Sequence, residues 1–109
     1  GEITMAMIKI DNTNYKQELV EDKGFKVVLF GASWCGPCRM YHPVVHEFAE
    51  KYPEVKLCAN DVDESTEAAA MFGIQSVPTT IIMKNGSEVT RVSGGMSLED
   101  LEKFVEDNK

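Results

Sequence analysis

Two cysteines separated by two residues are the groups in this 109-residue chain best placed to do chemistry. Cys35 and Cys38 enclose Gly36-Pro37, between an apolar stretch typical of a buried strand and a helical pattern. Cys35 is therefore expected at a helix N-terminus, where unpaired N–H groups stabilise a thiolate, the nucleophile in disulfide exchange. Cys38 follows one helical turn later, so it can resolve a mixed disulfide formed at Cys35. The spacing predicts that Cys35 is an exposed nucleophile and that Cys38 is a shielded resolving thiol.

Two histidines continue the same helix face at four-residue intervals, His42 and His46. Histidine titrates near neutral pH, so His42 is a candidate base for the cysteine pair. The alternative is a partly exposed helix histidine without a chemical role. Cysteine and histidine are also zinc ligands, but one helix would place Cys38, His42 and His46 along a line, and Pro43 distorts that helix further. No metal site is expected.

A third cysteine, Cys58, lies in an apolar stretch that predicts a strand. A buried core thiol is the favoured interpretation. The alternative, a regulatory or intermolecular thiol, requires an exposed position.

Periodicity and turn signals predict the elements that must hold these residues. The expected strands are Met5–Ile10, Lys26–Ala32, Val55–Val62, a segment of Ile74–Met83 and Glu88–Val92. The expected helices run to about Val20, from Gly36 to about Tyr52, over Ala68–Phe72 with Ser65 as cap, and onward from a near capping box of Ser97 and Asp100. Asn85-Gly86 predicts a hairpin between the last two strands. The order β-α-β-α-β-α-β-β-α indicates an α/β protein with a mixed sheet of about five strands between four helices.

Length and composition limit the classes of function. A hydrophobic content of 43% and a charged content of 27% are ordinary for a globular protein, and residues 1–109 fit one domain. The formal charge of −7 disfavours nucleic acids and anionic membranes as partners.

No apolar run approaches the roughly 20 residues that span a bilayer, and no signal-peptide pattern is present. No glycine-rich phosphate loop follows a strand, so no nucleotide or flavin cofactor is expected and electrons must come from a partner protein.

The segment Trp34-Cys35-Gly36-Pro37-Cys38 resembles the active site of the thioredoxin family. The element order matches the thioredoxin fold over nearly the whole chain. Further matches are Pro43 within the helix, Val77-Pro78-Thr79 before a strand, Lys84-Asn85-Gly86 in the hairpin and Gly94 before the last helix. A lone pair of cysteines at this spacing is a weak signal, whereas five features in the same order are specific.

This resemblance implies a disulfide reductase in which Cys35 and Cys38 alternate between a dithiol and a redox disulfide. The Gly-Pro between the cysteines is similar to that of reducing thioredoxins, whose potential is about −270 mV. The resemblance implies a thioredoxin reductase as electron donor and protein disulfides as substrates. A reducing dithiol also favours the cytoplasm, and a monomer is expected.

The resemblance also assigns residues around the cysteine pair. Pro78 is expected to follow a cis peptide bond and to face the cysteines, with the Val77 backbone offered to an extended substrate. The alternative for Pro78 is an ordinary turn proline. Gly94 lacks a Cβ atom, which would let a substrate backbone approach. The expected docking surface consists of Trp34, Gly36, Pro37, Val77 and Gly94, with Pro78 beside it.

The chain departs from the family pattern beneath the cysteines. Leu29 stands where a buried aspartate is usual, and Ala59 stands where a lysine commonly partners it. Losing both charges together avoids an unpaired buried charge. Without the aspartate, the pKa of Cys38 should be raised and resolution should be slower, with better fold stability. Gly31 replaces a large aromatic residue found in many relatives, so looser packing is expected near the site.

Two other classes of function stay open at this point. Leu29 and Ala59 are compatible with a redox-silent or narrow-client binding module that uses the same docking groove. Retention of both cysteines argues against it. A thiol oxidase or isomerase outside the cytoplasm is disfavoured by the Gly-Pro dipeptide and by the missing signal.

Overall fold

The computed structural model describes residues 7–109 and contains one five-stranded mixed sheet in the order β1-β3-β2-β4-β5. Strands β1, β3 and β2 are parallel, while β4 and β5 run antiparallel to their neighbours. The strands are β1 (Met7–Ile10), β2 (Lys26–Gly31), β3 (Lys56–Asp61), β4 (Thr79–Lys84) and β5 (Ser87–Ser93). The mixed sheet and the central place of the apolar strand are as predicted. The first predicted strand begins at Met5, outside the described residues.

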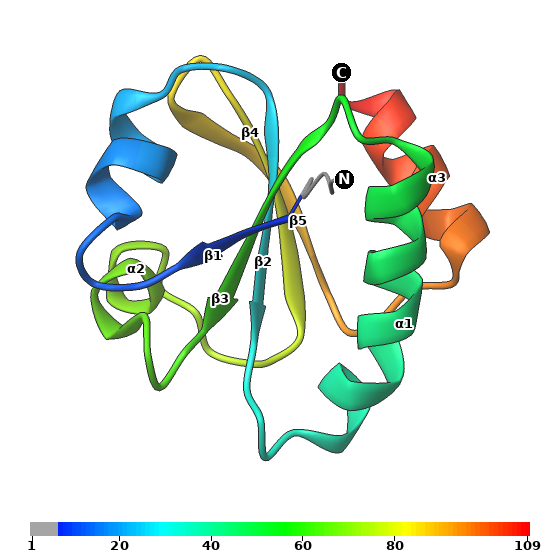
Figure 1. Ribbon diagram of the computed structural model, residues 1–109, viewed down its shortest axis with the longest axis horizontal. Helices are drawn as coiled ribbons and strands as arrows, with labels where there is room; N and C mark the ends of the chain where they lie inside the picture. Colours follow the sequence, from blue (N-terminus) through cyan, green and yellow to red (C-terminus); the bar gives the residue numbers. More distant parts are fainter. Residues whose placement is uncertain (1–6) are drawn as a thin grey trace.

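Helices cover both faces of this sheet, as Figure 1 shows. One layer contains α1 (Gly36–Lys51) and α3 (Leu98–Asp107), and the other contains α2 (Thr66–Met71) and a short π-helix, η1 (Lys16–Glu21). Residues 7–109 contain four helices, the number predicted. Among residues 7–109 no helix combines the length and the apolarity needed to cross a bilayer.

The central strand β2 is apolar throughout because it contributes to two cores. Val27 and Leu29 pack on the layer of α1 and α3, while Val28 and Phe30 pack on the layer of η1 and α2. All four side chains are buried. The absence of polar alternation in the sequence therefore has a direct cause, since alternate side chains of a strand point to opposite faces.

Local signals at the element ends are mostly as predicted. The Ser97 hydroxyl accepts the Asp100 N–H at 3.1 Å at the start of α3, and Asn85-Gly86 turns the hairpin with both residues at positive φ. Ser65 occupies the N-cap position of α2, but the prediction that its side chain caps the helix is wrong. Its buried hydroxyl instead donates to Asn60 Oδ1 at 3.0 Å, because a polar group in that core needs a partner.

Charged groups gather at the end of the sheet where β2 and β3 begin. The Lys56 ammonium contacts the carboxylates of Glu18 and Asp22, and the buried Lys26 ammonium donates to the carbonyls of Asp22 and Gly24. The hydrogen bond from Lys56, helped by the Gly24 N–H, lowers the pKa of Asp22 to about 2.

This ion pair predicts a pH-dependent stability. A carboxyl whose pKa is lowered on folding stabilises the protein above its unfolded pKa near 3.9, and that contribution is lost as pH falls toward 2. The Asp22 side chain is 39% exposed, so solvent screening limits the expected cost of Asp22→Asn to about 1 kcal/mol. Urea unfolding should show this difference at pH 7 and none near pH 2. If Asp22→Asn and wild type differed equally in free energy of unfolding at both pH values, the Asp22 carboxylate would not be the source of the difference.

Candidate active site

The topology brings four segments together at one edge of the sheet. Parallel strands β2 and β3 both end there, and the chain turns from β2 into the N-terminus of α1 (Figure 1). Strand β4 begins at the same edge, since Thr79 pairs with Phe30, and β5 ends there, since Ser93 pairs with Thr79. The cysteine pair, the Val77-Pro78 turn and Gly94 therefore share one corner of the molecule.

Cys35 occupies the N-cap position of α1, as the sequence predicts. Its sulfur accepts the N–H of Cys38 at 3.2 Å and lies 3.7 Å from the Val77 carbonyl oxygen, to which the thiol donates. A sulfur that accepts a helix-terminal N–H is stabilised as a thiolate. Local backbone geometry thus provides the charge stabilisation that a nucleophile needs.

Cys38 follows in the first turn of α1, where its sulfur adjoins Gly31. Burial, followed by the hydrogen bond with Cys35, raises the pKa of Cys38 to about 11. This is the direction predicted from the sequence. Cys38 is thus protonated at neutral pH, and it needs a proton acceptor before it can attack a disulfide.

The predicted exposure of Cys35 is wrong, whereas the shielding predicted for Cys38 is partial. Cys35 is buried, with 6% of its surface exposed, whereas Cys38 is half-buried. Cys35 turns inward, toward the Val77 carbonyl. Gly31 adds no side chain over Cys38, and a Cβ atom at Gly31 would lie 3.5 Å from the Cys38 sulfur.

The two positions that lack the family's charges are direct neighbours. Leu29 of β2 pairs in register with Ala59 of β3, and both point to the face covered by α1. Leu29 is buried, but Ala59 stays half-exposed although β3 is an interior strand. The helix layer therefore does not cover the sheet completely at this point.

The uncovered part of the sheet is a cavity of about 440 Å³ beside Cys38, here called the Cys38 groove. Its apolar walls are Leu29 and Ala59 from the sheet and Tyr41 and Val45 from α1. Met7, Gly31 and Pro78 also line it, and the charged or polar residues around it are Lys9, Ser33, Arg39, His42, Asn60 and Asp61. Gly31 borders this groove, and the looser packing expected there stays a prediction.

The docking residues implied by the resemblance lie around Cys35. The Val77-Pro78 peptide bond is cis, as predicted, and the Gly94 N–H donates to the Pro78 carbonyl at 2.8 Å. Gly94 has φ +94°, which favours glycine independently of any substrate. Trp34 is 65% exposed, and Pro37 and Gly94 are exposed, whereas Gly36 and Val77 are half-buried and Pro78 is buried.

Sequence reasoning missed two polar residues that shape this corner. Asp63 accepts the indole N–H of Trp34 at 2.8 Å and so fixes the exposed ring. Asn60 donates to the Leu29 carbonyl at 2.9 Å beneath the site, and Met40 adds an exposed apolar side chain to α1. The sequence could have indicated Asn60 and Asp63, which lie at or just after the end of β3. Residues at the carboxyl ends of adjacent parallel strands meet at the same edge of the sheet.

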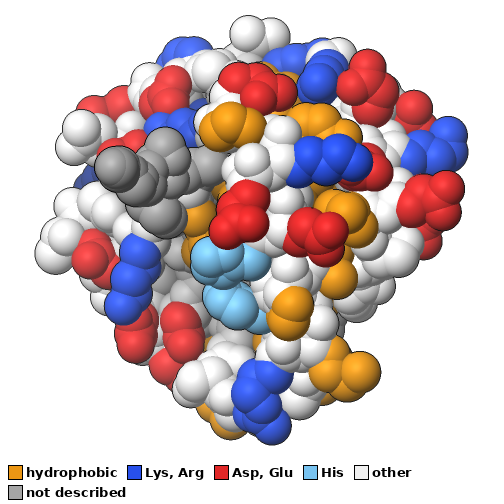
Figure 2. All heavy atoms as spheres, turned by 45° about the vertical axis from the view of Figure 1, so that its right-hand side comes forward, with side chains coloured by type: hydrophobic (Ala, Val, Ile, Leu, Met, Phe, Trp, Pro, Cys, Tyr) orange, Lys and Arg blue, Asp and Glu red, His pale blue; other side chains and the backbone are white. Residues whose placement is uncertain are grey.

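His42 lines the Cys38 groove and is exposed, as is His46. Their rings meet edge to face at 5.2 Å, and Figure 2 shows the two side chains together in pale blue. The structure therefore places His42 near Cys38 without a direct hydrogen bond between them among the described residues. No group of three or more potential metal ligands occurs within residues 7–109.

Cys58 is fully buried on the opposite face of the sheet, among residues that pack on η1 and α2. Burial raises the pKa of its thiol to about 11. The prediction of a core thiol is confirmed, and Cys58 lies on the other side of the sheet from the face that carries α1.

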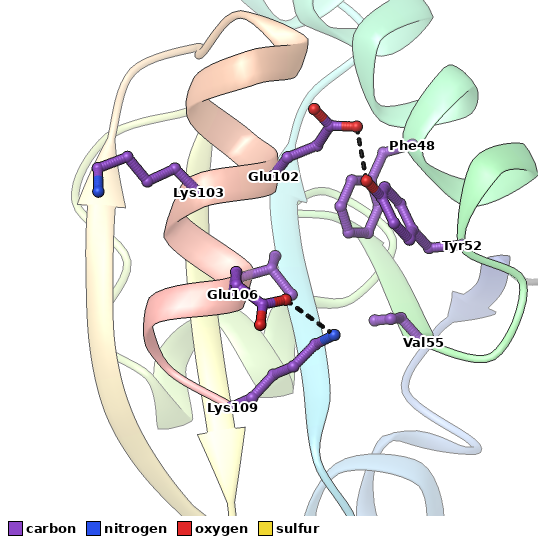
Figure 3. A pocket seen from close by; sticks show the side chains of 8 residues that line it. Phe48, Tyr52, Val55, Glu102, Lys103, Glu106 and Lys109 are labelled. Atoms are coloured by element: carbon purple, nitrogen blue, oxygen red, sulfur yellow. Dashed lines mark hydrogen bonds and ion pairs between the residues drawn. The ribbon is translucent and has the colours of Figure 1, made fainter.

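A smaller cavity of about 260 Å³ lies between the end of α1 and α3 (Figure 3). Tyr52 donates to Glu102 at 2.8 Å across it, and Lys109 pairs with Glu106 at 3.2 Å. No cysteine or histidine lines this cavity, so it contributes nothing to the chemistry of the site.

A mixed sheet between two helix layers, with a cysteine pair at a helix N-terminus facing a cis-proline turn, defines a dithiol–disulfide redox protein. The family model described as Thioredoxin matches residues 6–107, so the chain belongs to the thioredoxin family and to its thiol-disulfide oxidoreductases.

Individual relatives agree with this placement. The chain is 37% identical to a thioredoxin of Staphylococcus haemolyticus over 94% of this chain and 97% of the relative. It is 40% identical to a thioredoxin of Alicyclobacillus acidocaldarius over the same shares. It is 41% identical to thioredoxin H2 of Arabidopsis thaliana over 81% of this chain, and the match spans 65% of that relative's length.

Proposed function

We propose that this protein reduces disulfide bonds in other proteins, with Cys35 as the nucleophile and Cys38 as the resolving cysteine. The observation that carries the proposal is the Cys35 sulfur at the N-cap of α1, where it accepts the Cys38 N–H at 3.2 Å. The apolar ring of Trp34 and the Val77-Pro78 turn beside it suit an extended, partly apolar substrate.

The reaction proceeds in two exchanges. The Cys35 thiolate attacks one sulfur of the substrate disulfide and expels the other as a thiolate, which leaves a mixed disulfide at Cys35. Cys38 then loses its proton, attacks the Cys35 sulfur and expels the second substrate thiolate. The products are a reduced substrate, carrying two electrons and two protons, and a Cys35–Cys38 disulfide.

The cycle requires a source of electrons, and the proposed donor is a thioredoxin reductase. The proposal further places the protein in the cytoplasm, as a single-domain monomer that acts on protein disulfides. The Gly-Pro between the cysteines supports the reducing direction through the family resemblance.

Insulin reduction with dithiothreitol tests the proposed activity. The wild-type protein should accelerate precipitation of the insulin B chain well above the rate with dithiothreitol alone. Cys58→Ala is the matched control, because its thiol is buried on the other face of the sheet, and it should retain the wild-type rate. A rate equal to the dithiothreitol background would instead identify a redox-silent or narrow-client binding module.

His42 is the proposed proton acceptor for Cys38, acting across the Cys38 groove. His42→Ala should lower the rate of insulin reduction at pH 7 about tenfold and shift the pH–rate profile upward, because hydroxide must then remove the proton. His46→Ala is the control one turn away on the same helix and should leave the profile unchanged. If both variants keep the wild-type profile, His42 is not the base.

A further inference from the structure

The only two histidines in the sequence lie together on the surface of α1. His42 and His46 are four residues apart, so their side chains leave the helix on the same side, one turn apart. Both are exposed, with 5.2 Å between the ring centres and 65° between the ring planes. Figure 2 shows the two imidazoles side by side in pale blue. Each therefore presents ring nitrogens that an ion in solution can reach.

The spacing of the two rings suits a shared metal ion. A zinc–nitrogen bond is about 2.0–2.1 Å long, and a ring nitrogen lies about 1.2 Å from the centre of an imidazole. Two imidazoles held at the tetrahedral angle on one zinc ion therefore have ring centres about 5 Å apart. The 5.2 Å between His42 and His46 equals this spacing, although Pro43 lies between them within the helix. Rotation of the rings, without a change in the backbone, turns one nitrogen of each toward a common ion.

A site of this kind is open rather than closed. A structural zinc site uses four protein ligands, whereas the two imidazoles supply two. Among residues 7–109 no third cysteine, histidine or acidic side chain completes a group of potential ligands, so water takes the remaining positions on the ion. Such a site binds metal reversibly. Imidazole nitrogen selects cations of the zinc, nickel and copper type over magnesium or calcium.

The charges around the pair also favour a cation. The chain has a formal net charge of −7, and Figure 2 shows acidic side chains bordering the two imidazoles. Two basic residues line the Cys38 groove together with His42, and both have other partners. Lys9 pairs with Glu64 at 3.1 Å, and Arg39 donates to the Ser33 carbonyl at 2.9 Å. A divalent cation is therefore attracted to this surface.

We propose that His42 and His46 bind one divalent cation of the zinc type between them, through one ring nitrogen each. Both imidazoles must be unprotonated, so metal and protons compete for the same nitrogens. The site does not depend on the proposed function, since it involves neither cysteine. Its consequence does rest on that function, because a His42 imidazole that holds a metal ion has no free lone pair for the Cys38 proton. Metal binding and proton transfer by His42 therefore exclude each other.

Proton NMR of the imidazoles tests the site, because a chain with two histidines gives two sets of ring signals. Tag-free wild-type protein is used with Cys35 and Cys38 oxidised, so that no thiolate of the pair competes for the metal. Zn²⁺ is added stepwise at about pH 7.5, where imidazole is mostly unprotonated, in a buffer that does not bind metals. Both sets of signals should change together, with one midpoint and an end point of one Zn²⁺ per chain. Signals that stay unchanged, or a change in one set alone, would overturn the proposal.

A matched variant moves one histidine out of register. His46→Ala combined with Glu47→His keeps two histidines at exposed positions, but it places them about 140° apart around the helix. This double variant should need at least about tenfold more Zn²⁺ than wild type for half-saturation, because the second imidazole no longer binds the same ion. Its two sets of signals should change independently. Equal Zn²⁺ affinity in the double variant and in wild type would show that each imidazole holds an adventitious ion only, which would overturn the shared site.

These outcomes are separate from the test of the proposed function. The zinc titration contains neither substrate nor reductant, whereas insulin reduction is measured without added metal. Insulin reduction by the wild type, together with unchanged imidazole signals, would reject the metal site alone. A joint change of both imidazoles, together with no insulin reduction, would support the site and reject the proposed function.

Discussion

Replacing Cys35 by serine is expected to lower insulin reduction to the rate of dithiothreitol alone. Serine fits the same N-cap position, so α1 should keep its cap while the nucleophilic sulfur is lost. Cys38 cannot replace it, because burial raises the pKa of Cys38 and leaves little thiolate at neutral pH. The measurement is the insulin turbidity rate with equal amounts of variant and wild type, accompanied by a urea unfolding curve.

The unfolding curve separates loss of chemistry from loss of fold. Cys35→Ser should unfold at a urea concentration close to that of the wild type, since only one sulfur atom changes. A variant that folds and still reduces insulin at more than a few per cent of the wild-type rate would show that Cys35 is not the nucleophile.

Replacing Leu29 by aspartate is expected to raise the rate of insulin reduction and to lower the free energy of unfolding. The carboxylate would line the Cys38 groove and could accept the proton of Cys38, which should raise insulin reduction at pH 7 about tenfold. The same change buries a charge opposite Ala59 without a cation and should reduce the free energy of unfolding by about 3 kcal/mol. Burial raises the pKa of such a carboxyl, so the destabilisation should be larger at pH 7 than at pH 4.

Leu29→Asn is the matched control for this prediction. It introduces a polar side chain of similar size that cannot accept the proton, so it should lose stability without gaining rate. The prediction is measured by insulin reduction and by urea unfolding at both pH values. Equal insulin-reduction rates for Leu29→Asp, Leu29→Asn and wild type would show that proton removal from Cys38 does not limit the reaction.

The architecture could be predicted from the sequence because its signals are local. The apolar run of β2, the Asn85-Gly86 turn and the Ser97 cap each depend on a few adjacent residues, and the structure contains all three. Ser65 shows the limit of such signals. Its position at the start of α2 was evident, but its hydroxyl bonds to Asn60 in the core, a tertiary contact that no local pattern encodes.

The relative burial of the two cysteines could not be predicted for a similar reason. Spacing places both sulfurs at the start of α1, but their exposure depends on the Val77 carbonyl and on the missing side chain of Gly31. These contacts join segments far apart in the sequence. The family resemblance predicted that Leu29 and Ala59 are neighbours. The groove beside Cys38 could not be predicted in the same way, because it depends on how β2, β3 and α1 pack together.

Trapping of the protein-substrate intermediate tests the assignment of the nucleophile most directly. Cys38→Ser and Cys35→Ser are each reduced, mixed with insulin and analysed by non-reducing peptide mass mapping. An insulin chain should accumulate as a mixed disulfide on Cys35 in Cys38→Ser, and no insulin adduct should form in Cys35→Ser. An insulin adduct that accumulates on Cys38 in Cys35→Ser and is absent from Cys38→Ser would instead make Cys38 the nucleophile.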